Sequence, residues 1–280
     1  MTGIEALAGV TIVVPNLQAG IGAYRDWLGY VPGEVAVVGD ALAAQWGAPG
    51  AAAARTVTLC PESGETRFIR LIEGQADPGY QPLASLGWIA AEIIVQDVDA
   101  LAERLGAETS PFKIIGPPAV LDFEFTDQIK AMQVVGPGGE TLYLTEVGAP
   151  IPGFHLPAAK SFVGAPFIMV LGARDIAHAA AHYASPRHPL GPVFEARIEV
   201  LSTALDMPTA YRHRLATVAF GESTLIEIDA FPPHAPIRAL STVGMPSGIA
   251  VVSFLGVNPQ PRMTGAAGEW FEIIANPLVS

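Results

Sequence analysis

Apolar residues gather in short runs along the chain, each followed by a polar residue and then a helix-like stretch. Three runs have the character of buried strands and span 10–14, 91–95 and 167–171. The polar residues that follow them are Asn16, Asp97 and Asp175. Because Asn and Asp side chains accept hydrogen bonds from the free N–H groups of a first helical turn, the pattern predicts a helix after each of these strands.

A second feature repeats at the far end of each segment. A Gly-Glu pair occurs at 64–65, 139–140, 221–222 and 268–269, before strand-like runs at 67–72, 141–146, 224–229 and 270–274. Gly tolerates positive φ, so such a pair favours a hairpin turn. The first three segments have room for a helix and two more strands, whereas only a loop fits between Phe254 and Gly268. The sequence predicts an α+β protein of repeated βαβββ units, three full and the fourth truncated.

Pro and Gly cluster at 77–82, 148–153 and 231–236, and such clusters interrupt helices and strands. The cluster nearest the midpoint predicts a boundary between two lobes. The expected N-terminal lobe spans 1–150, with units at 5–75 and 86–147. The expected C-terminal lobe spans 162–280, with units at 165–230 and 247–276.

Composition narrows the range of partners. The 280 residues are 50% hydrophobic and 15% charged, and 27 acidic residues against 15 basic ones give a net charge of −12. Nucleic acid is not an expected partner, because phosphate binding needs clustered Lys and Arg. A membrane is not expected either, because the apolar runs are far shorter than the roughly 20 residues that span a bilayer. The lone Cys60 and the lack of a basic, then apolar, leader favour a cytoplasmic location.

The opening segment carries a resemblance to a known family. Val10-Thr11-Ile12-Val13-Val14-Pro15-Asn16-Leu17, followed by Tyr24-Arg25-Asp26-Trp27-Leu28-Gly29-Tyr30, resembles the first strand and helix of the vicinal oxygen chelate superfamily. That superfamily includes glyoxalase I, bleomycin-resistance proteins and extradiol dioxygenases. The resemblance implies that paired units form curved, cup-like mixed sheets.

The resemblance also implies where metal ligands would lie, on the opening and closing strands of the units. The corresponding opening positions here are Gly9, Ala90, Ile168 and about Gly248. The closing positions are Arg70, Tyr143, Glu227 and Glu272. A catalytic metal normally has three protein ligands, so we expect no metal and no other cofactor. If a divalent metal is bound, Glu227 and Glu272 are its expected ligands.

Glu227 and Glu272 are the first candidate catalytic residues. Each alternates with apolar neighbours, so the period of two sends the carboxylates to the face opposite those neighbours. If the third and fourth units pair, the two acids meet in the C-terminal cup, and their repulsion raises one pKa. The result is a general base for a carbon acid. The alternative is that both acids line a solvated sheet face.

The strand expected at 210–220 supplies the next candidates. Tyr211 and His213 share one of its faces, and Arg212 and Arg214 share the other. His213 is a candidate acid or base because imidazole titrates near neutral pH, and its neighbours are candidates for binding substrate. Arg70 and Tyr143 suit an anionic or phenolic group in the N-terminal cup, unless that half is only structural support.

These observations favour an enzyme, a lyase or isomerase acting on a carbonyl-bearing or aromatic metabolite with a carboxylate base. The first alternative is a metal-free protein that binds a drug-like molecule, as in resistance. The second is a metal-dependent glyoxalase or dioxygenase. The expected partner is a small molecule, and exposed sheet edges favour a homodimer.

Overall fold

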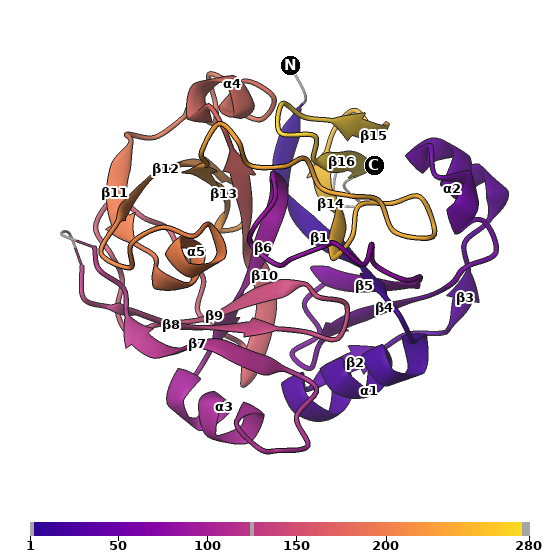
Figure 1. Cartoon of the computed structure of the whole chain (residues 1–280), viewed down its shortest axis with the longest axis horizontal. Coiled ribbons are helices and arrows are strands. Elements are labelled where there is room, and N and C mark those ends of the chain that lie inside the picture. Colours follow the sequence, from indigo (N-terminus) through magenta and orange to yellow (C-terminus); the bar gives the residue numbers. More distant parts are fainter. Residues whose placement is uncertain (1–2, 124–125, 276–280) are drawn as a thin grey trace.

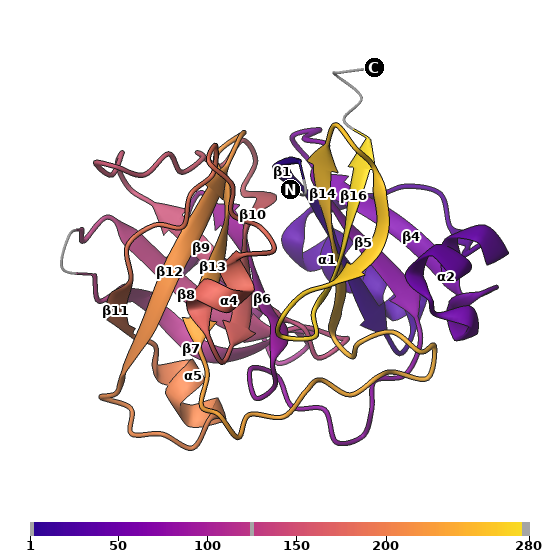
Figure 2. The same cartoon turned by 90° about the horizontal axis from the view of Figure 1, so that it is seen from above.

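The computed structural model describes residues 3–123 and 126–275 and contains two eight-stranded mixed sheets that lie side by side (Figures 1 and 2). Sheet A contains β1 (Ile4–Val14), β2 (Tyr30–Pro32), β3 (Ala36–Val37), β4 (Arg55–Pro61), β5 (Phe68–Glu73), β14 (Ile249–Gly256), β15 (Gln260–Thr264) and β16 (Trp270–Ala275). Sheet B contains β6 (Gly87–Val95), β7 (Lys113–Val120), β8 (Ile129–Val135), β9 (Thr141–Val147), β10 (Val163–Ala173), β11 (Phe194–Arg197), β12 (Arg212–Phe220) and β13 (Thr224–Ala230). The predicted α+β class and the repeated units are confirmed.

The helices are short and follow the opening strands or lie within connections. They are α1 (Leu17–Leu28), α2 (Asp40–Trp46), α3 (Val98–Leu105), α4 (Ile176–Ala180) and α5 (Glu199–Ala204). The predicted caps are confirmed: the side chains of Asn16, Asp97 and Asp175 accept hydrogen bonds from backbone N–H groups at 3.0, 2.9 and 2.8 Å. No helix among the described residues is long and apolar enough to cross a membrane.

The units pair differently from the expected arrangement. In sheet A, β1 runs antiparallel to β14, so the first unit is joined to the fourth. In sheet B, β6 runs antiparallel to β10, so the second unit is joined to the third. Each sheet therefore combines one unit from each half of the sequence. All four opening strands are almost wholly buried, and such strands carry no pattern that specifies which of the others lies alongside.

The fourth unit is less reduced than expected. Between β14 and β16 the chain forms β15, which pairs with β16 at the edge of sheet A. The sequence of this strand, Gln-Pro-Arg-Met-Thr, is polar and contains a proline, and both features are typical of an edge strand. The unit thus lacks the helix and one strand rather than everything between its first and last strands.

Two buried Tyr–Glu hydrogen bonds connect the sheets. The hydroxyl of Tyr24, on α1, donates to Glu140 at 2.7 Å, and the other oxygen of Glu140 accepts from the N–H of Gly138 at 2.7 Å. The hydroxyl of Tyr183, just beyond α4, donates to Glu269 at 2.6 Å. Glu140 and Glu269 come from the repeated Gly-Glu pairs. In both places, the hairpin acid of one sheet holds the helical segment attached to the other.

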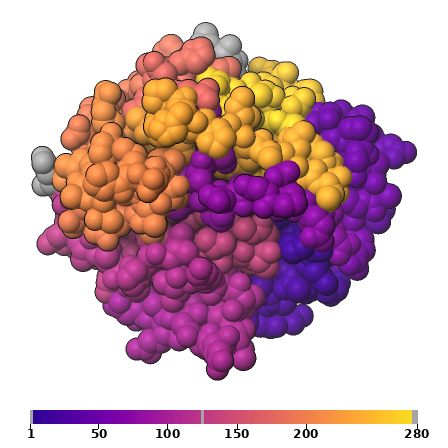
Figure 3. Space-filling view, viewed as in Figure 1, coloured from indigo at the N-terminus to yellow at the C-terminus, as the bar shows by residue number. Residues whose placement is uncertain are grey.

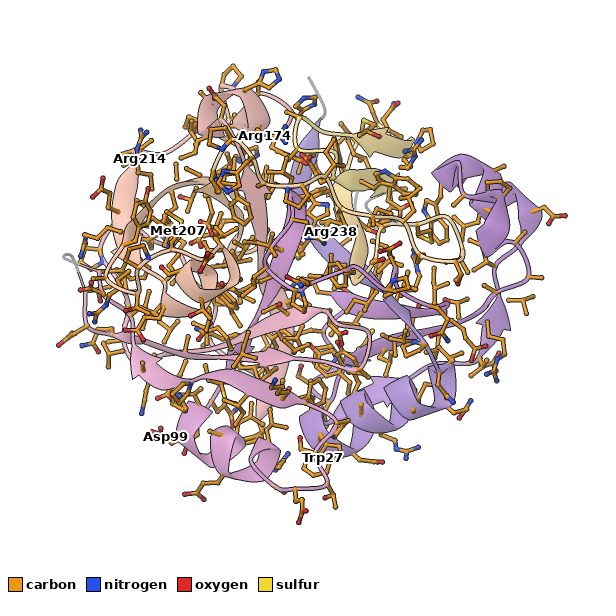
Figure 4. The ribbon with its side chains drawn as sticks, in the orientation of Figure 1. Trp27, Asp99, Arg174, Met207, Arg214 and Arg238 are labelled. Carbon is orange, nitrogen blue, oxygen red and sulfur yellow. The ribbon has the colours of Figure 1, made fainter. Side chains whose placement is uncertain are left out.

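The segments that connect the sheets also lie side by side across one face (Figure 3). The N–H of Leu86 donates to the carbonyl of Pro236 at 2.9 Å, and that of Thr242 donates to the carbonyl of Gln75 at 2.8 Å. The buried guanidinium of Arg238 donates to the Ser85 hydroxyl at 3.1 Å and to backbone carbonyls of both sheets (Figure 4). The two sheets therefore form one body around a shared junction.

We expect Tyr24→Phe to lower the free energy of unfolding by about 1–3 kcal/mol, because Glu140 stays buried after losing a hydrogen-bond donor. Urea denaturation at neutral pH measures the change. Tyr211→Phe is the control, since Tyr211 is 42% exposed and its ring remains in place. Equal effects of the two substitutions would show that the Tyr24–Glu140 bond does not stabilise the sheet junction.

Candidate active site in sheet B

A cavity of about 720 Å³ lies over one face of sheet B and is closed on one side by α5. Its walls are mainly apolar, with Phe154, Leu156, Phe167, Phe194, Leu215 and Leu225 among them. A volume of this size fits a drug-sized organic molecule. We call this cavity cup B.

Polar side chains form the floor of cup B. Glu92 on β6, Tyr143 on β9 and Glu227 on β13 all line the cavity. Glu92 pairs with Tyr143 across β6 and β9, whereas β10 separates β6 from β13. The Thr145 hydroxyl donates to Glu92 at 3.0 Å and fixes one oxygen of that carboxyl group. Three strands of one sheet thus bring these groups together.

A third acid lies next to Glu227. Asp229 is two residues further along β13 and fully buried, and its carboxyl group hydrogen-bonds with that of Glu227. Apart from this bond, neither oxygen of Asp229 has a hydrogen-bond partner among the described residues. Two carboxyl groups can share a hydrogen bond only if one of them carries the proton. We call Glu92, Glu227 and Asp229 the acid cluster.

Burial raises the pKa of every member of the acid cluster. Desolvation, followed by repulsion from Glu227, raises the pKa of Glu92 to about 8. Desolvation also raises the pKa of Glu227 to about 7, against an opposing hydrogen bond with Asp229. The pKa of Asp229 lies well above its ordinary value for the same reason, with Glu227 and Glu92 adding repulsion. Near neutral pH the cluster therefore contains both protonated acids and a group that can accept a proton.

No Lys or Arg among the described lining residues lies on the strands that carry the acid cluster. Among the described lining residues, the basic ones are Lys113 and Arg197, on the edge strands β7 and β11. Arg197 lies 3.7 Å from Glu199 and 4.0 Å from Asp122. The Tyr143 hydroxyl is buried with no hydrogen-bond partner among the described residues. The floor therefore offers a proton acceptor and unused proton donors to a ligand.

Glu272 lies elsewhere, in sheet A. It accepts hydrogen bonds from Ser253 at 2.7 Å and from the indole of Trp46 at 2.9 Å, and it forms an ion pair with Arg70 at 3.5 Å. The expectation that Glu227 and Glu272 converge is wrong, because the third and fourth units belong to different sheets. The same geometry rules them out as joint ligands of one metal.

Large side chains surround Glu272 on sheet A. Trp46, at the end of α2, is fully buried beside Glu272. The guanidinium of Arg70 lies 4.9 Å from the centre of the Phe68 ring and 5.5 Å from that of Trp46. Arg70 and Tyr143 were expected in one cup and instead lie on different sheets, and only Tyr143 lines the cavity.

The strand bearing His213 does not bring its candidates to the floor. His213 is fully buried, its Nε2 lies 2.8 Å from the Ser202 hydroxyl of α5, and burial lowers its pKa. Arg212 is bonded to Asp122 at 3.0 Å, and Arg214 lies at the periphery of the molecule (Figure 4). Tyr211 packs edge-on against His213. None of these four residues is among the described residues that line cup B.

Two members of the acid cluster were not predicted from the sequence. Glu92 lies two residues beyond Ala90, the position assigned to the opening strand by counting back from the cap. Asp229 shares a face with Glu227 because alternate residues of a strand point the same way. A single acid within the apolar run 87–95 was the available signal for Glu92.

The donors at the floor do not fit a divalent metal. The residues on the two central opening strands and their closing neighbours are Glu92 with Tyr143 and Val170 with Glu227. They provide two carboxyl groups, a phenol and an alkyl group. Among residues 3–123 and 126–275, no group of three or more His, Cys, Asp or Glu side chains could hold a metal ion. Catalytic metal sites normally use three such ligands, so these residues do not fit a catalytic metal ion.

Known proteins were compared with the chain at the level of sequence and of structure. No protein-family profile and no curated protein matches the sequence. Glyoxalase I from Zea mays matches the structure with a TM-score of 0.61 and 12% identity, over 97% of this chain and 92% of that chain. A provisionally assigned dioxygenase from Bacillus subtilis matches with a TM-score of 0.61 and 13% identity, over 99% of this chain and 87% of that chain. The chain has the vicinal oxygen chelate fold.

Identity this low shows the fold of this protein and leaves its chemistry to the site itself. Both matches extend over nearly the whole chain, so the arrangement of two sheets, and not only that of one unit, is shared.

The raised pKa values predict how stability depends on pH. In the folded state the pKa of Glu92 is about 8, whereas its ordinary pKa is 4.5, so the folded protein binds this proton more tightly. The stabilisation from that bound proton is complete below the unfolded value and is lost as the pH rises through the folded one. We therefore expect the free energy of unfolding to fall from about pH 5 to about pH 8, and to fall less steeply in Glu92→Gln.

Urea denaturation across this pH range measures both slopes. Glu62→Gln removes an exposed acid and is the control, with an expected slope equal to that of the wild type. A Glu92→Gln slope identical to that of the wild type would contradict the raised pKa of Glu92.

Proposed function

We propose that this protein catalyses proton transfer at a carbon next to a carbonyl group of an apolar or aromatic small molecule, as an isomerase or a lyase. The observation that supports this is the acid cluster at the floor of an apolar cavity, with no cation beside it. An uncompensated acid in such a place is costly to bury, and raised carboxyl pKa values are typical of acid–base sites.

The base in this proposal is Glu227. Its pKa of about 7 leaves a substantial fraction ionised at neutral pH, and its side chain lines the cavity. A base with a pKa near the working pH combines the correct protonation state with a useful driving force. Asp229 is a positioning residue, because its proton holds the Glu227 carboxyl group in place from the neighbouring position on β13.

The substrate carbonyl oxygen accepts hydrogen bonds from Glu92 and Tyr143. With a pKa of about 8, Glu92 is mostly protonated at neutral pH and can donate. The Tyr143 hydroxyl is buried and lacks a hydrogen-bond partner among the described residues, so it can donate as well. Donors aimed at the oxygen where negative charge develops stabilise an enolate more than the parent ketone. Thr145 keeps Glu92 oriented.

The step balances with these groups alone. Glu227 removes the proton, and the electron pair of the broken C–H bond moves toward the carbonyl carbon while negative charge collects on oxygen. Return of the proton from Glu227 to the γ-carbon of an enolate conjugated with a second double bond gives an isomer. In a lyase, the enolate electrons re-form the carbonyl group and a new carbon–carbon double bond, a group on the β-carbon leaves with its bonding electron pair, and Glu227 gives its proton to that group. The apolar walls exclude water and strengthen each of these interactions.

Deuterium exchange tests the proposal without knowledge of the natural substrate. We expect the wild-type protein to accelerate loss of the α-proton signals of 2-tetralone, an aromatic ketone, in D2O followed by NMR. Glu227→Gln keeps the shape of the side chain and should slow exchange by about a hundredfold or more.

Glu272→Gln is the matched control, since it removes an acid from the equivalent strand of the other sheet and leaves cup B intact. It should exchange 2-tetralone at the wild-type rate. Equal rates for wild type and Glu227→Gln, or no acceleration over buffer, would contradict a catalytic base at this position.

A second function is supported by the missing cation at the floor, namely binding of a drug-like amine without turnover. An ammonium group attached to an apolar body would be attracted to the acid cluster. The matched probe is 2-aminotetralin. A melting temperature that rises with 2-aminotetralin, through mass action on the folded state, together with no exchange of 2-tetralone would favour this function over the first.

A further inference from the structure

We infer that cup B recognises a ligand with one anionic group at the end remote from its carbonyl, and that Lys113 binds this group at the mouth. The inference rests on the proposed function, which places the carbonyl at the acid cluster. It adds the charge of the substrate and the distance between its carbonyl group and its anionic group. The substrate class is then an aromatic or alicyclic keto acid.

The charges at the mouth single out Lys113. Arg197 lies near Glu199 and Asp122, and Arg212 is bonded to Asp122 at 3.0 Å, so both guanidinium groups already have carboxylate partners. Lys113 lines the cavity, is exposed, and forms no ion pair with a carboxylate in the described part of the chain. It is therefore the lining cation still able to pair with a ligand.

The strand register places Lys113 at a useful distance from the floor. Lys113 pairs with Val135 across β7 and β8, and Gln133 pairs with Tyr143 across β8 and β9. Lys113 is thus displaced from Tyr143 by two residues along the strands and two strands across the sheet. With about 3.4 Å per residue and about 4.8 Å per strand, the two Cα atoms lie on the order of 12 Å apart.

That separation and the floor charge restrict the ligand. An anion cannot lie at the floor, where the acid cluster would repel it, but it can lie at the mouth beside the ammonium group. The lining of the cavity near Lys113 includes the apolar side chains of Ile115 and Val135. A body of two fused or linked rings with an acceptor at one end and an anion at the other fits this distribution of polarity.

Two fluorescent probes that differ by one charge test the inference. 8-Anilinonaphthalene-1-sulfonate carries an apolar body and one anion, and N-phenyl-1-naphthylamine has the same rings without the sulfonate. We expect Lys113→Gln to weaken binding of the sulfonate about three- to fivefold at low ionic strength and to leave the uncharged probe unaffected. Added salt should reduce the difference.

Lys130→Gln is the matched control. It removes the same charge from β8, where Lys130 is bonded to Asp99 and does not line the cavity. We expect it to bind both probes as the wild type does. Equal loss of both probes in Lys113→Gln, no loss of the sulfonate, or failure of the wild type to bind the sulfonate would each overturn the inference.

The experiment separates this inference from the proposed function. Glu227→Gln should retain the Lys113-dependent preference for the sulfonate, because the two groups lie at opposite ends of the cavity. If the probes bind as expected but the wild-type protein does not accelerate exchange of 2-tetralone, Glu227 is rejected as the base and the role of Lys113 stands. If exchange depends on Glu227 but Lys113→Gln does not selectively weaken binding of the sulfonate, the role of Lys113 is rejected and the base stands.

Discussion

The buried acid cluster constrains everything else that we conclude about this protein. Two carboxyl groups line the floor of an apolar cavity, a third lies next to one of them on the same strand, and the described lining cations are on the edge strands. Such groups cannot all be ionised in a low-dielectric site, so the cluster retains protons at a pH where exposed acids have lost theirs. Retained protons turn a carboxyl group into a donor, and the resulting mixture of donors and an acceptor suits proton transfer.

The pairing of units determines which acids meet. Had the third and fourth units shared a sheet, Glu227 would have faced Glu272. Instead Glu227 shares sheet B with Glu92, and Glu272 shares sheet A with Arg70. The acids of the two sheets differ in their contacts. Glu272 forms an ion pair with Arg70 and accepts hydrogen bonds from Ser253 and the buried Trp46, whereas Glu92 and Glu227 line a cavity. The two sheets thus place equivalent acids in different surroundings, one beside an arginine and a tryptophan and the other on the floor of a cavity.

Local features of this fold could be read from the sequence, and long-range ones could not. The caps at Asn16, Asp97 and Asp175 depend on a few adjacent residues, and so they were predicted correctly. Alternation placed Glu227 on the opposite face from its apolar neighbours, and that face lines a cavity. The partner of each opening strand depends on contacts between segments far apart in the chain, which periodicity does not encode. Glu92 was missed for a local reason, since counting from the cap selected Ala90 instead.

The repeated Gly-Glu pairs show the same difference between local features, which the sequence predicts, and long-range contacts, which it does not. Their glycines predicted hairpin turns, but no local pattern indicates that Glu140 and Glu269 accept hydrogen bonds from Tyr24 and Tyr183 of the other sheet. These bonds lie between segments 116 and 86 residues apart. They connect segments of the two sheets.

The charge state of the acid cluster is the central claim, and carbon-13 NMR of labelled glutamate carboxyl groups measures it most directly. Resonances assigned through Glu92→Gln and Glu227→Gln should titrate with midpoints near pH 8 and 7, as expected for acids raised by burial without a neighbouring cation. Titration of both groups near the ordinary value of 4.5 would show that the floor is solvated and would contradict the account.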